Sequence, residues 1–160
     1  MKIVRTTYLS LGTNLGNRIV NLQSAIDEIN LSVGHVRKIS SVYKTRSWGF
    51  EGEDFYNICL EVSSSLTPEK MIKTVLDIER KLGRLRSTQQ GYNNRIIDID
   101  ILLFDDEIIF YNDLKVPHPE MLKRKFVLAP LTEIAPNVIH PIAKKTILIC
   151  LQNCPDNGVI

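Results

Sequence analysis

The chain has 160 residues, 44% of them hydrophobic, which is enough for one domain with a substantial core and leaves little room for a second. The 20 Lys and Arg residues nearly balance the 18 Asp and Glu residues, so a net charge of +2 gives no strong electrostatic case for binding nucleic acid or a membrane. The three cysteines lack C-x-x-C spacing, which disfavours a disulfide framework and a zinc site. Without a secretory leader or an apolar stretch of about 20 residues, we expect a cytoplasmic protein with a single domain over residues 1–160.

The first part of the chain predicts a strand, a helix and two further strands. Residues 6–11 predict a short strand and residues 12–17 a turn, followed by a helix whose apolar stripe comprises Leu15, Ile19, Leu22, Ile26 and Ile29. Residues 35–45 predict a second strand. Residues 55–63 alternate strictly, which predicts a strand with one face of Tyr56, Ile58, Leu60 and Val62 and an opposite face of Phe55, Asn57, Cys59 and Glu61.

The second part begins with a helix that Thr67 caps and Pro68 starts. Gly83 ends this helix, and its apolar stripe comprises Met71, Val75, Ile78 and Leu82. A loop over residues 84–94, a strand over 95–104, a short strand over 108–111 and helical pieces near 120–123, 127–134 and 146–153 follow. The order strand, helix, strand, strand, helix, strand predicts an α+β fold, a ferredoxin-like sandwich with a mainly antiparallel sheet flanked by helices.

The strand over residues 95–104 contains two aspartates in an otherwise apolar run. Alternation places Asp98 and Asp100 on one face and Ile97, Ile99, Ile101 and Leu103 on the other. Two neighbouring carboxylates repel each other, and Mg²⁺, which takes one or two protein carboxylates and fills its other positions with water and phosphate oxygens, would offset them. A strand with a solvent-facing side is the alternative, but the apolar run is typical of a central strand and favours a site.

Basic residues surround this strand in the sequence. They are Arg84, Arg86, Arg95, His118, Lys123 and Arg124. Because guanidinium groups match phosphate oxygens, their combination with a carboxylate pair predicts a polyphosphate substrate. Other chemistries fit less well: the 12–16 turn matches neither dinucleotide nor P-loop spacing, no nucleophile elbow is present, and carboxylates side by side on one strand do not suit glycoside hydrolysis.

Several motifs together resemble the 6-hydroxymethyl-7,8-dihydropterin pyrophosphokinases of folate synthesis, over about residues 8–137. They are Leu11–Gly16, Ser41–Thr45, Phe55–Asn57, Gly83–Arg86, Arg95–Leu102, Val116–Pro119 and Arg124–Phe126. The combination of Arg-x-x-Asp-x-Asp with Val-Pro-His-Pro is far more selective than either motif alone. The resemblance implies transfer of the terminal pyrophosphate of ATP to the hydroxymethyl group of the pterin, with release of AMP.

The resemblance also implies roles for individual residues. Asp98 and Asp100 would hold two Mg²⁺ ions, and the catalytic set would be these two with Arg84, Arg86 and Arg95, of which Arg84 and Arg86 arrive when their loop closes. The nucleotide would be bound by Arg86, Arg95, Ile101, His118 and Arg124. Phe55 and Phe126 would sandwich the pterin ring, Thr45 and Asn57 would bond its polar edge, and Asp98 would contact the same substrate. Neither nucleic acid nor membrane would be a partner, and the protein would be a monomer or a weak homodimer.

Four positions depart from the family pattern. Tyr92 stands where tryptophan is frequent, Arg46 where proline is common, Trp48 where leucine is often found and Leu76 where a phosphate-contacting glutamine occurs. They bear on loop closure and phosphate contacts and leave the carboxylate pair unchanged. Two alternatives remain at this point. One is another Mg²⁺-dependent phosphoryl or nucleotidyl transferase, and the other is an RNA-binding module, against which the carboxylates argue because they repel phosphates.

Overall fold

The computed structural model describes residues 2–46, 53–83, 96–156 and 158. Its elements, in chain order, are β1 (Arg5–Thr13), α1 (Arg18–Ser32), β2 (His35–Ile39), β3 (Tyr43–Thr45), β4 (Phe55–Ser64), α2 (Pro68–Leu82), β5 (Asp98–Phe104), β6 (Ile109–Tyr111), β7 (Leu114–Val116), the 3₁₀ turn η2 (Met121–Lys123), α3 (Lys125–Ile134) and α4 (Ile147–Gln152). The helices predicted near 68–82, 127–134 and 146–153 are thereby confirmed.

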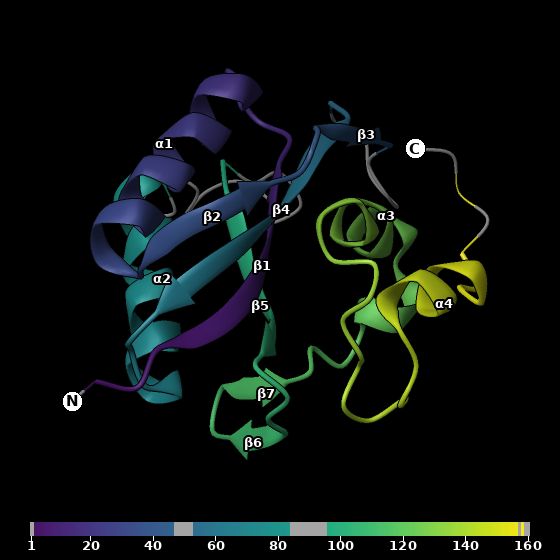
Figure 1. Ribbon diagram of the computed structural model, residues 1–160. Coiled ribbons are helices and arrows are strands. Elements are labelled where there is room, and N and C mark those ends of the chain that lie inside the picture. Colours follow the sequence, from purple (N-terminus) through teal and green to yellow (C-terminus); the bar gives the residue numbers. More distant parts are fainter. Residues whose placement is uncertain (1, 47–52, 84–95, 157, 159–160) are drawn as a thin grey trace.

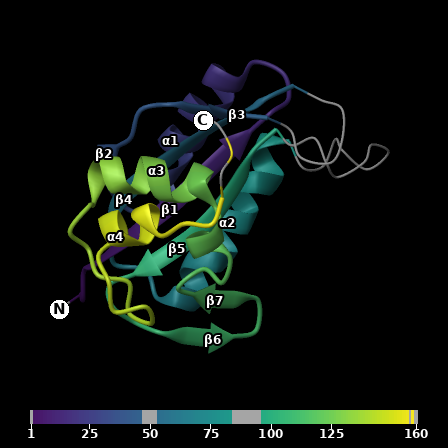
Figure 2. The same cartoon turned by 90° about the vertical axis from the view of Figure 1, so that its right-hand side faces the viewer.

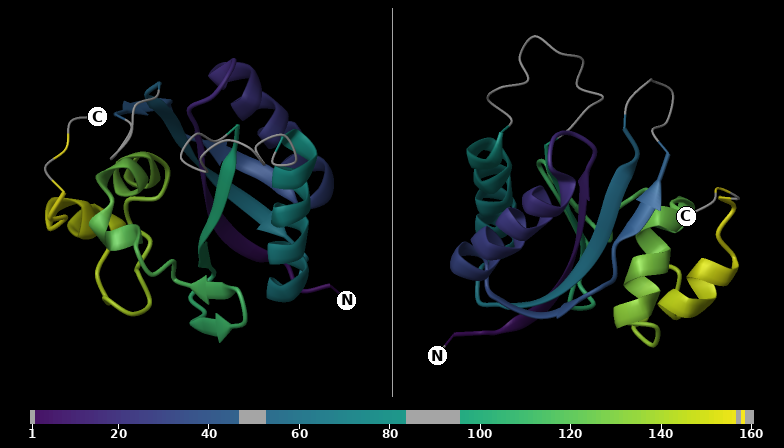
Figure 3. Two further views of the ribbon diagram at one scale, coloured as in Figure 1. Left: turned by 180° about the vertical axis from the view of Figure 1, so that it is seen from behind. Right: turned by 90° about the horizontal axis from the view of Figure 1, so that it is seen from above.

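The strands form an antiparallel sheet in the order β2-β4-β1-β5, with β3 also paired to β4, and a separate hairpin of β6 and β7. Helices α1 and α2 cover one face of the sheet, and α3 and α4 cover the other (Figure 1). The view from above in Figure 3 separates these layers, and Figure 2 shows α3 and α4 in front of the sheet. The predicted α+β fold, an antiparallel sheet flanked by helices, is confirmed.

Each face of the sheet packs against its own hydrophobic core. The core under α1 and α2 includes Leu9, Leu11, Ile58, Leu60 and Val75. The core under α3 and α4 includes Tyr8, Cys59, Leu102, Met121 and Leu128. Alternate residues of β4 enter different cores, with Ile58, Leu60 and Val62 in one and Cys59 in the other, so the alternation predicted for residues 55–63 is confirmed.

Side-chain caps fix where α1 and α2 begin. The Asn17 side chain accepts a hydrogen bond from Val20 N at the start of α1, and Thr67 accepts from Lys70 N at the start of α2. Gly83 ends α2 with a φ of 148°, a conformation that side chains disfavour, as expected for a helix-stopping glycine. The apolar stripe predicted for α1 is wrong at its beginning. Leu15 lies before the helix, and Ile19 is exposed in the first turn. Ala25, which was not in the predicted stripe, is buried.

Strand β5 differs from its prediction in two ways. It pairs with β1 alone among the described strands, so it is an edge strand and not a central one. Its apolar composition arises because both of its faces are covered. A bulge at Leu102, between the pairs Tyr8–Leu103 and Leu9–Ile101, then shifts the alternation, so Leu103 lies in the α3 and α4 core, contrary to the prediction, while Ile97, Ile99 and Ile101 lie in the other core as predicted.

The segment 35–45 forms two short strands, not one. Ser40 still bonds β4, since its backbone N–H donates to the Cys59 carbonyl and its hydroxyl accepts from Cys59 N. Ser41 instead turns to α3, where its backbone N–H and hydroxyl both donate to Glu133. The strand therefore breaks at the point where the chain leaves the sheet for the helix layer.

Candidate active site

Two rows of residues cross the three strands β4, β1 and β5 on the face toward α3. Gly12 pairs with Asn57 on one side and with Asp98 on the other. Ser10 likewise pairs with Cys59 and Asp100. Because directly opposed residues of antiparallel strands point to the same face, Asn57, Asp98 and Asp100 share one surface of the sheet. Residues predicted separately for the pterin and for the metal thus lie about two strand spacings, or roughly 10 Å, apart.

The carboxylates stand near an imidazole from the Val-Pro-His-Pro segment. The distance from His118 Nε2 to Asp100 Oδ2 is 3.9 Å, and the Asp100 side chain is 43% exposed. The backbone N–H of His118 donates to the Leu102 carbonyl over 3.0 Å, which attaches this segment to the open edge of β5. His118 Nδ1 accepts from Glu120 N over 3.1 Å, so a neutral His118 carries its proton on Nε2, toward Asp100.

The charge of His118 is set mainly by its surroundings. Burial lowers its pKa most, nearby Arg124 lowers it further, and Asp100 acts in the opposite direction, with a net lowering. The imidazole is therefore neutral at pH 7 and offers a single N–H donor at Nε2. Such a donor suits an anionic oxygen placed beside Asp100.

A pocket of about 200 Å³ adjoins Asp100 and His118. Its lining comes from α2, β5, the β6 and β7 hairpin and the Val-Pro-His-Pro segment after β7: Ile72, Ile99, Asp100, Ile101, Asp113, Leu114, Lys115, His118 and Pro119. Lys115 and Asp113 were missed by the sequence reasoning, which predicted β6 but not β7. The signal lay in the two-residue Asn112-Asp113 turn, at which Asn112 adopts a φ of 49° and Tyr111 pairs with Leu114.

The amide of Asn57 is held by β3. Asn57 is 3% exposed, and its Nδ2 donates to Thr45 Oγ1 over 2.9 Å and to the Tyr43 carbonyl over 3.4 Å. Phe55 lies two residues before Asn57 on the same strand face. The structure thus brings three of the predicted pterin-binding residues together on β3 and β4.

Arg124 and Phe126, predicted to bind the nucleotide and the pterin, lie at the start of α3. The guanidinium carbon of Arg124, which precedes the helix, lies 5.8 Å from the centre of the Phe126 ring. Helix α3 packs against β4, and Cys59 Sγ approaches the Val127 carbonyl at 3.6 Å. An arginine and an aromatic ring therefore stand next to each other on the helix layer that faces the carboxylate strand.

Glu79 is a site residue that sequence reasoning missed. It is 7% exposed on the core side of α2, and its Oε2 accepts from Ile99 N over 2.7 Å, between the two aspartates of β5. The signal was a glutamate among the apolar positions Val75, Ile78 and Leu82, where helical spacing predicts a buried side chain.

Arg84, Arg86 and Arg95 lie outside the described residues, as do Trp48 and Tyr92 among the departures from the family pattern. Within residues 2–46, 53–83, 96–156 and 158, no group of three or more His, Cys, Asp or Glu side chains could hold a metal ion. Two carboxylates are nevertheless a usual protein contribution to a Mg²⁺ site that substrate oxygens complete. None of the described helices combines the length and apolar character that crossing a bilayer requires.

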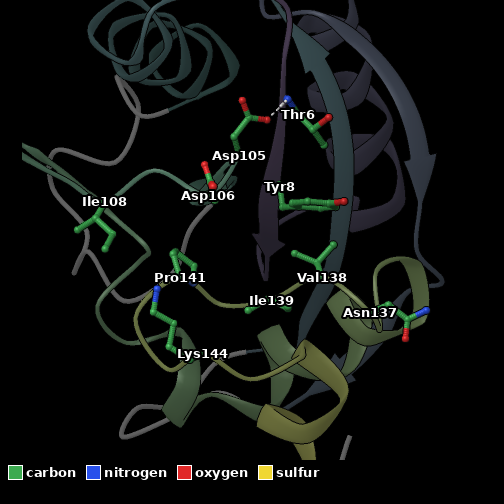
Figure 4. Close-up of a pocket in the computed structure, with 10 residues that line it drawn as sticks. All are labelled: Thr6, Tyr8, Asp105, Asp106, Ile108, Asn137, Val138, Ile139, Pro141 and Lys144. Carbon is green, nitrogen blue, oxygen red and sulfur yellow. Dashed lines mark hydrogen bonds between the residues drawn. The ribbon is translucent and has the colours of Figure 1, made fainter.

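A second groove, of about 620 Å³, lies elsewhere (Figure 4). Its lining includes Thr6, Tyr8, Asp105 and Lys144. Thr6 and Gly12 are six residues apart on β1, so the groove is about 20 Å along the strand from the carboxylate pair. Thr6 N donates to Asp105 Oδ1, and Arg5 contacts Oδ2 at 4.0 Å. None of the predicted site residues lines this groove.

Glu133 anchors β3 to α3. The Tyr43 hydroxyl donates to Glu133 Oε1 over 2.7 Å, and the Ser41 backbone N–H and hydroxyl donate to Oε2 over 2.9 and 3.0 Å. Burial, with the hydrogen bond to Glu133, raises the pKa of Tyr43 to about 12. Burial alone would raise the pKa of Glu133, but the bonds from Tyr43 and Ser41 outweigh it and lower that pKa. The strand that carries Thr45 is thereby tied to the helix that carries Phe126.

Alkaline pH should weaken this anchor. Tyr43 ionises near pH 10.0 in the unfolded chain and near 12 in the folded one, so its stabilising contribution is complete below pH 10 and is lost as the pH rises toward 12. We expect the free energy of unfolding in urea to fall more steeply with pH in the wild type than in Tyr43→Phe over this window. Glu133 is exposed, so solvent screening keeps the difference modest. Identical slopes would contradict the assignment.

Comparisons with known proteins show the family of the chain. The family model described as 7,8-dihydro-6-hydroxymethylpterin-pyrophosphokinase (HPPK) matches residues 8–136. The 2-amino-4-hydroxy-6-hydroxymethyldihydropteridine pyrophosphokinase of Aquifex aeolicus is 44% identical over 141 residues, covering 88% of this chain and 86% of the relative. The protein of the same name from a Synechocystis species is 40% identical over 145 residues, covering 90% of this chain and 73% of the relative.

A crystal structure of wild-type Plasmodium falciparum HPPK-DHPS has the same fold. It aligns with a TM-score of 0.78 at 17% sequence identity and covers 95% of this chain, but this chain covers only 45% of that one. The named relatives transfer pyrophosphate from ATP to the hydroxymethyl group of a dihydropterin in folate biosynthesis, and this chain has that activity. The chain belongs to the 7,8-dihydro-6-hydroxymethylpterin pyrophosphokinase family.

Proposed function

We propose that this transfer takes place on the sheet face that carries Asn57, Asp98 and Asp100, with the two aspartates holding two Mg²⁺ ions. The observation that carries the proposal is the row in which Gly12 joins Asn57 to Asp98. It puts an amide suited to a heterocycle two strands away from carboxylates suited to a hard cation. Bound Mg²⁺ would supply neutralisation of the charge on the phosphate oxygens.

ATP would lie along β5, with part of the nucleotide in the pocket next to Asp100. His118 offers its Nε2 proton there, and Lys115 adds a positive charge at the pocket wall. Ile101 also lines this pocket, although its side chain is only 4% exposed. Arg124, beside Phe126, would bind phosphate oxygens where the two substrates meet.

The pterin would lie between β4 and the start of α3. Phe55 and Phe126 would hold its ring from the strand and from the helix, while Asn57 and Thr45 would bond its polar edge. A binding site for a flat heterocycle combines aromatic surface with a few fixed polar groups. The Asn57 amide is such a group, because two hydrogen bonds to β3 hold it in place. Asp98, in the row of Asn57, would contact the same substrate near its hydroxymethyl group.

The bonds that change follow from the products. The hydroxymethyl oxygen attacks the β-phosphorus of ATP, the bond from that phosphorus to the α,β-bridging oxygen breaks, and AMP leaves with the bridging oxygen and its electron pair. The hydroxyl proton passes to solvent or to a carboxylate. Since phosphoryl transfer depends mainly on alignment and charge neutralisation, the residues act by positioning. By the family resemblance, Arg84, Arg86 and Arg95 would add positive charge to the phosphates.

A product assay tests this proposal. Protein incubated with ATP, Mg²⁺ and the hydroxymethyl dihydropterin should form AMP and the pterin pyrophosphate in equal amounts, separated by ion-exchange chromatography. Chelation of Mg²⁺ should stop the reaction, and restoring Mg²⁺ should recover it. Formation of ADP would indicate monophosphate transfer, and full activity in the chelator would contradict the metal role.

Other features of the protein remain proposals of the same kind. The antiparallel order β2-β4-β1-β5 and the placement of α1 and α2 on one face support a ferredoxin-like sandwich. We further propose a single pyrophosphokinase domain over residues 1–160 that is a monomer or a weak homodimer. A cytoplasmic location stays a prediction.

A further inference from the structure

Gly12 occupies a strand position where glycine is usually disfavoured. Glycine in the interior of a strand costs conformational entropy and contributes no packing, so it often marks a place where another group approaches closely. The positive-φ glycines of the described residues are Gly16 and Gly83, and Gly12 is not among them. Its backbone would therefore accept alanine without strain. The absence of a side chain, and not backbone freedom, is the property that this position uses.

A side chain at Gly12 would meet two residues of the proposed pterin site. An added Cβ would lie 3.0 Å from Asn57 Oδ1 and 3.8 Å from Phe55 Cδ1. The first distance is tighter than an ordinary van der Waals contact, and the second is an ordinary one. The added methyl group would thus cover the amide oxygen and rest against the aromatic ring.

The Asn57 amide cannot readily turn away from such a group. Its Nδ2 donates to the Tyr43 carbonyl, which can only accept, so the amide is oriented with nitrogen toward β3 and oxygen toward Gly12. Among the described residues, Asn57 Oδ1 accepts no hydrogen bond. The oxygen is therefore available to a ligand that lies over Gly12.

We propose that Gly12 determines specificity for the acceptor substrate by leaving Asn57 Oδ1 open to an N–H donor on the edge of the flat heterocycle. This inference rests on the proposed role of Asn57 in pterin binding. The empty space above Gly12 lets the ring edge reach the amide oxygen while the other end of the ring points along the row toward Asp98. A substrate with an acceptor in place of that N–H would be rejected, because two acceptors would face each other.

Gly12→Ala tests this inference through the Michaelis constants of the two substrates. A single methylene in a binding pocket changes discrimination by about 10- to 200-fold, so we expect a rise of that order in the KM for the pterin. The KM for ATP and the kcat should change less than about twofold, since the nucleotide pocket lies on the far side of β5. An unchanged KM for the pterin, or an equal rise in both KM values, would overturn the inference.

Gly16→Ala is the matched control. Gly16 has a φ of 70° and nothing within 4 Å of an added Cβ, so alanine there strains the backbone without filling any space. It should lower the unfolding temperature at least as much as Gly12→Ala does and leave the KM for the pterin unchanged. A general loss of fold at Gly12 would appear as a loss of ATP binding, measured by calorimetry on the same preparation.

A double-mutant cycle with Asn57→Ala separates the inference from the proposal beneath it. If the added methyl acts by covering Asn57 Oδ1, Gly12→Ala should add less than about twofold to the effect of Asn57→Ala. If the double variant raises the KM for the pterin by the full product of the two single-variant rises, Gly12→Ala does not act through Asn57, and the inference is overturned. If Asn57→Ala itself leaves the KM for the pterin unchanged, the proposed pterin site is wrong. If it raises that KM and Gly12→Ala does not, only the inference about Gly12 fails.

Discussion

Asp100→Asn should lower kcat by about 100-fold or more at saturating Mg²⁺ while the protein stays folded. Metal ions contribute several kcal/mol of transition-state stabilisation, and about 1.4 kcal/mol corresponds to a factor of ten in rate. Asparagine keeps the size of the side chain and removes the charge that would hold the cation. The fold should persist, because Asp100 is 43% exposed and its removal relieves repulsion from Asp98. Steady-state kinetics over a Mg²⁺ titration measure the effect.

Asp106→Asn is the control for this variant. Asp106 follows the same strand but lines the distant groove, so its neutralisation should leave kcat and the Mg²⁺ dependence unchanged. Turnover near the wild-type value in Asp100→Asn, at any Mg²⁺ concentration, would refute the metal role of Asp100.

Glu79→Leu should lower both stability and turnover. It removes the acceptor of the Ile99 N–H, and leaving a buried donor unsatisfied costs about 1–3 kcal/mol. Because Ile99 lies between Asp98 and Asp100, the loss should also shift the carboxylates, and a misplacement of about 1 Å can cost a factor of 100 in rate. Urea unfolding and kcat measured on the same variant report the two effects.

Glu79→Gln is the informative partner of this variant. Its amide oxygen can still accept from Ile99 N, so it should recover part of the stability that leucine loses. If the Glu79→Leu and Glu79→Gln variants have equal free energies of unfolding, Glu79 does not stabilise the protein through its hydrogen bond to Ile99. If Glu79→Leu is less stable but has normal kcat, Glu79 does not position the aspartates.

Much of the site could be predicted because alternation is a local property. The pattern of residues 55–63 placed Asn57 and Phe55 on one face, and the pattern around Asp98 and Asp100 placed both carboxylates together. The helix signals at Thr67, Pro68 and Gly83 were likewise local and were confirmed. What these patterns could not contain is the pairing of both segments with Gly12, because register between strands depends on packing across the whole sheet.

Most features that sequence reasoning missed depend on contacts distant along the chain, and the β6 and β7 hairpin, closed by the Tyr111–Leu114 pair, is the local exception. The bulge at Leu102 moves Leu103 to the other core, and nothing in the apolar run marks it. The same run predicted a central strand, although helices cover both faces of what is an edge strand. The break after Ser40 depends on Glu133, 92 residues away from Ser41. Among the missed features, only Glu79 and the Asn112-Asp113 turn have a recognisable signal in the amino-acid sequence.

The most direct test of the carboxylate site is a crystal structure with Mg²⁺ and a non-hydrolysable ATP analogue. We expect metal density between the side chains of Asp98 and Asp100 and the phosphate oxygens, with the nucleotide extending past His118. A structure in which the analogue is bound and both carboxylates contact neither metal nor phosphate would contradict the account.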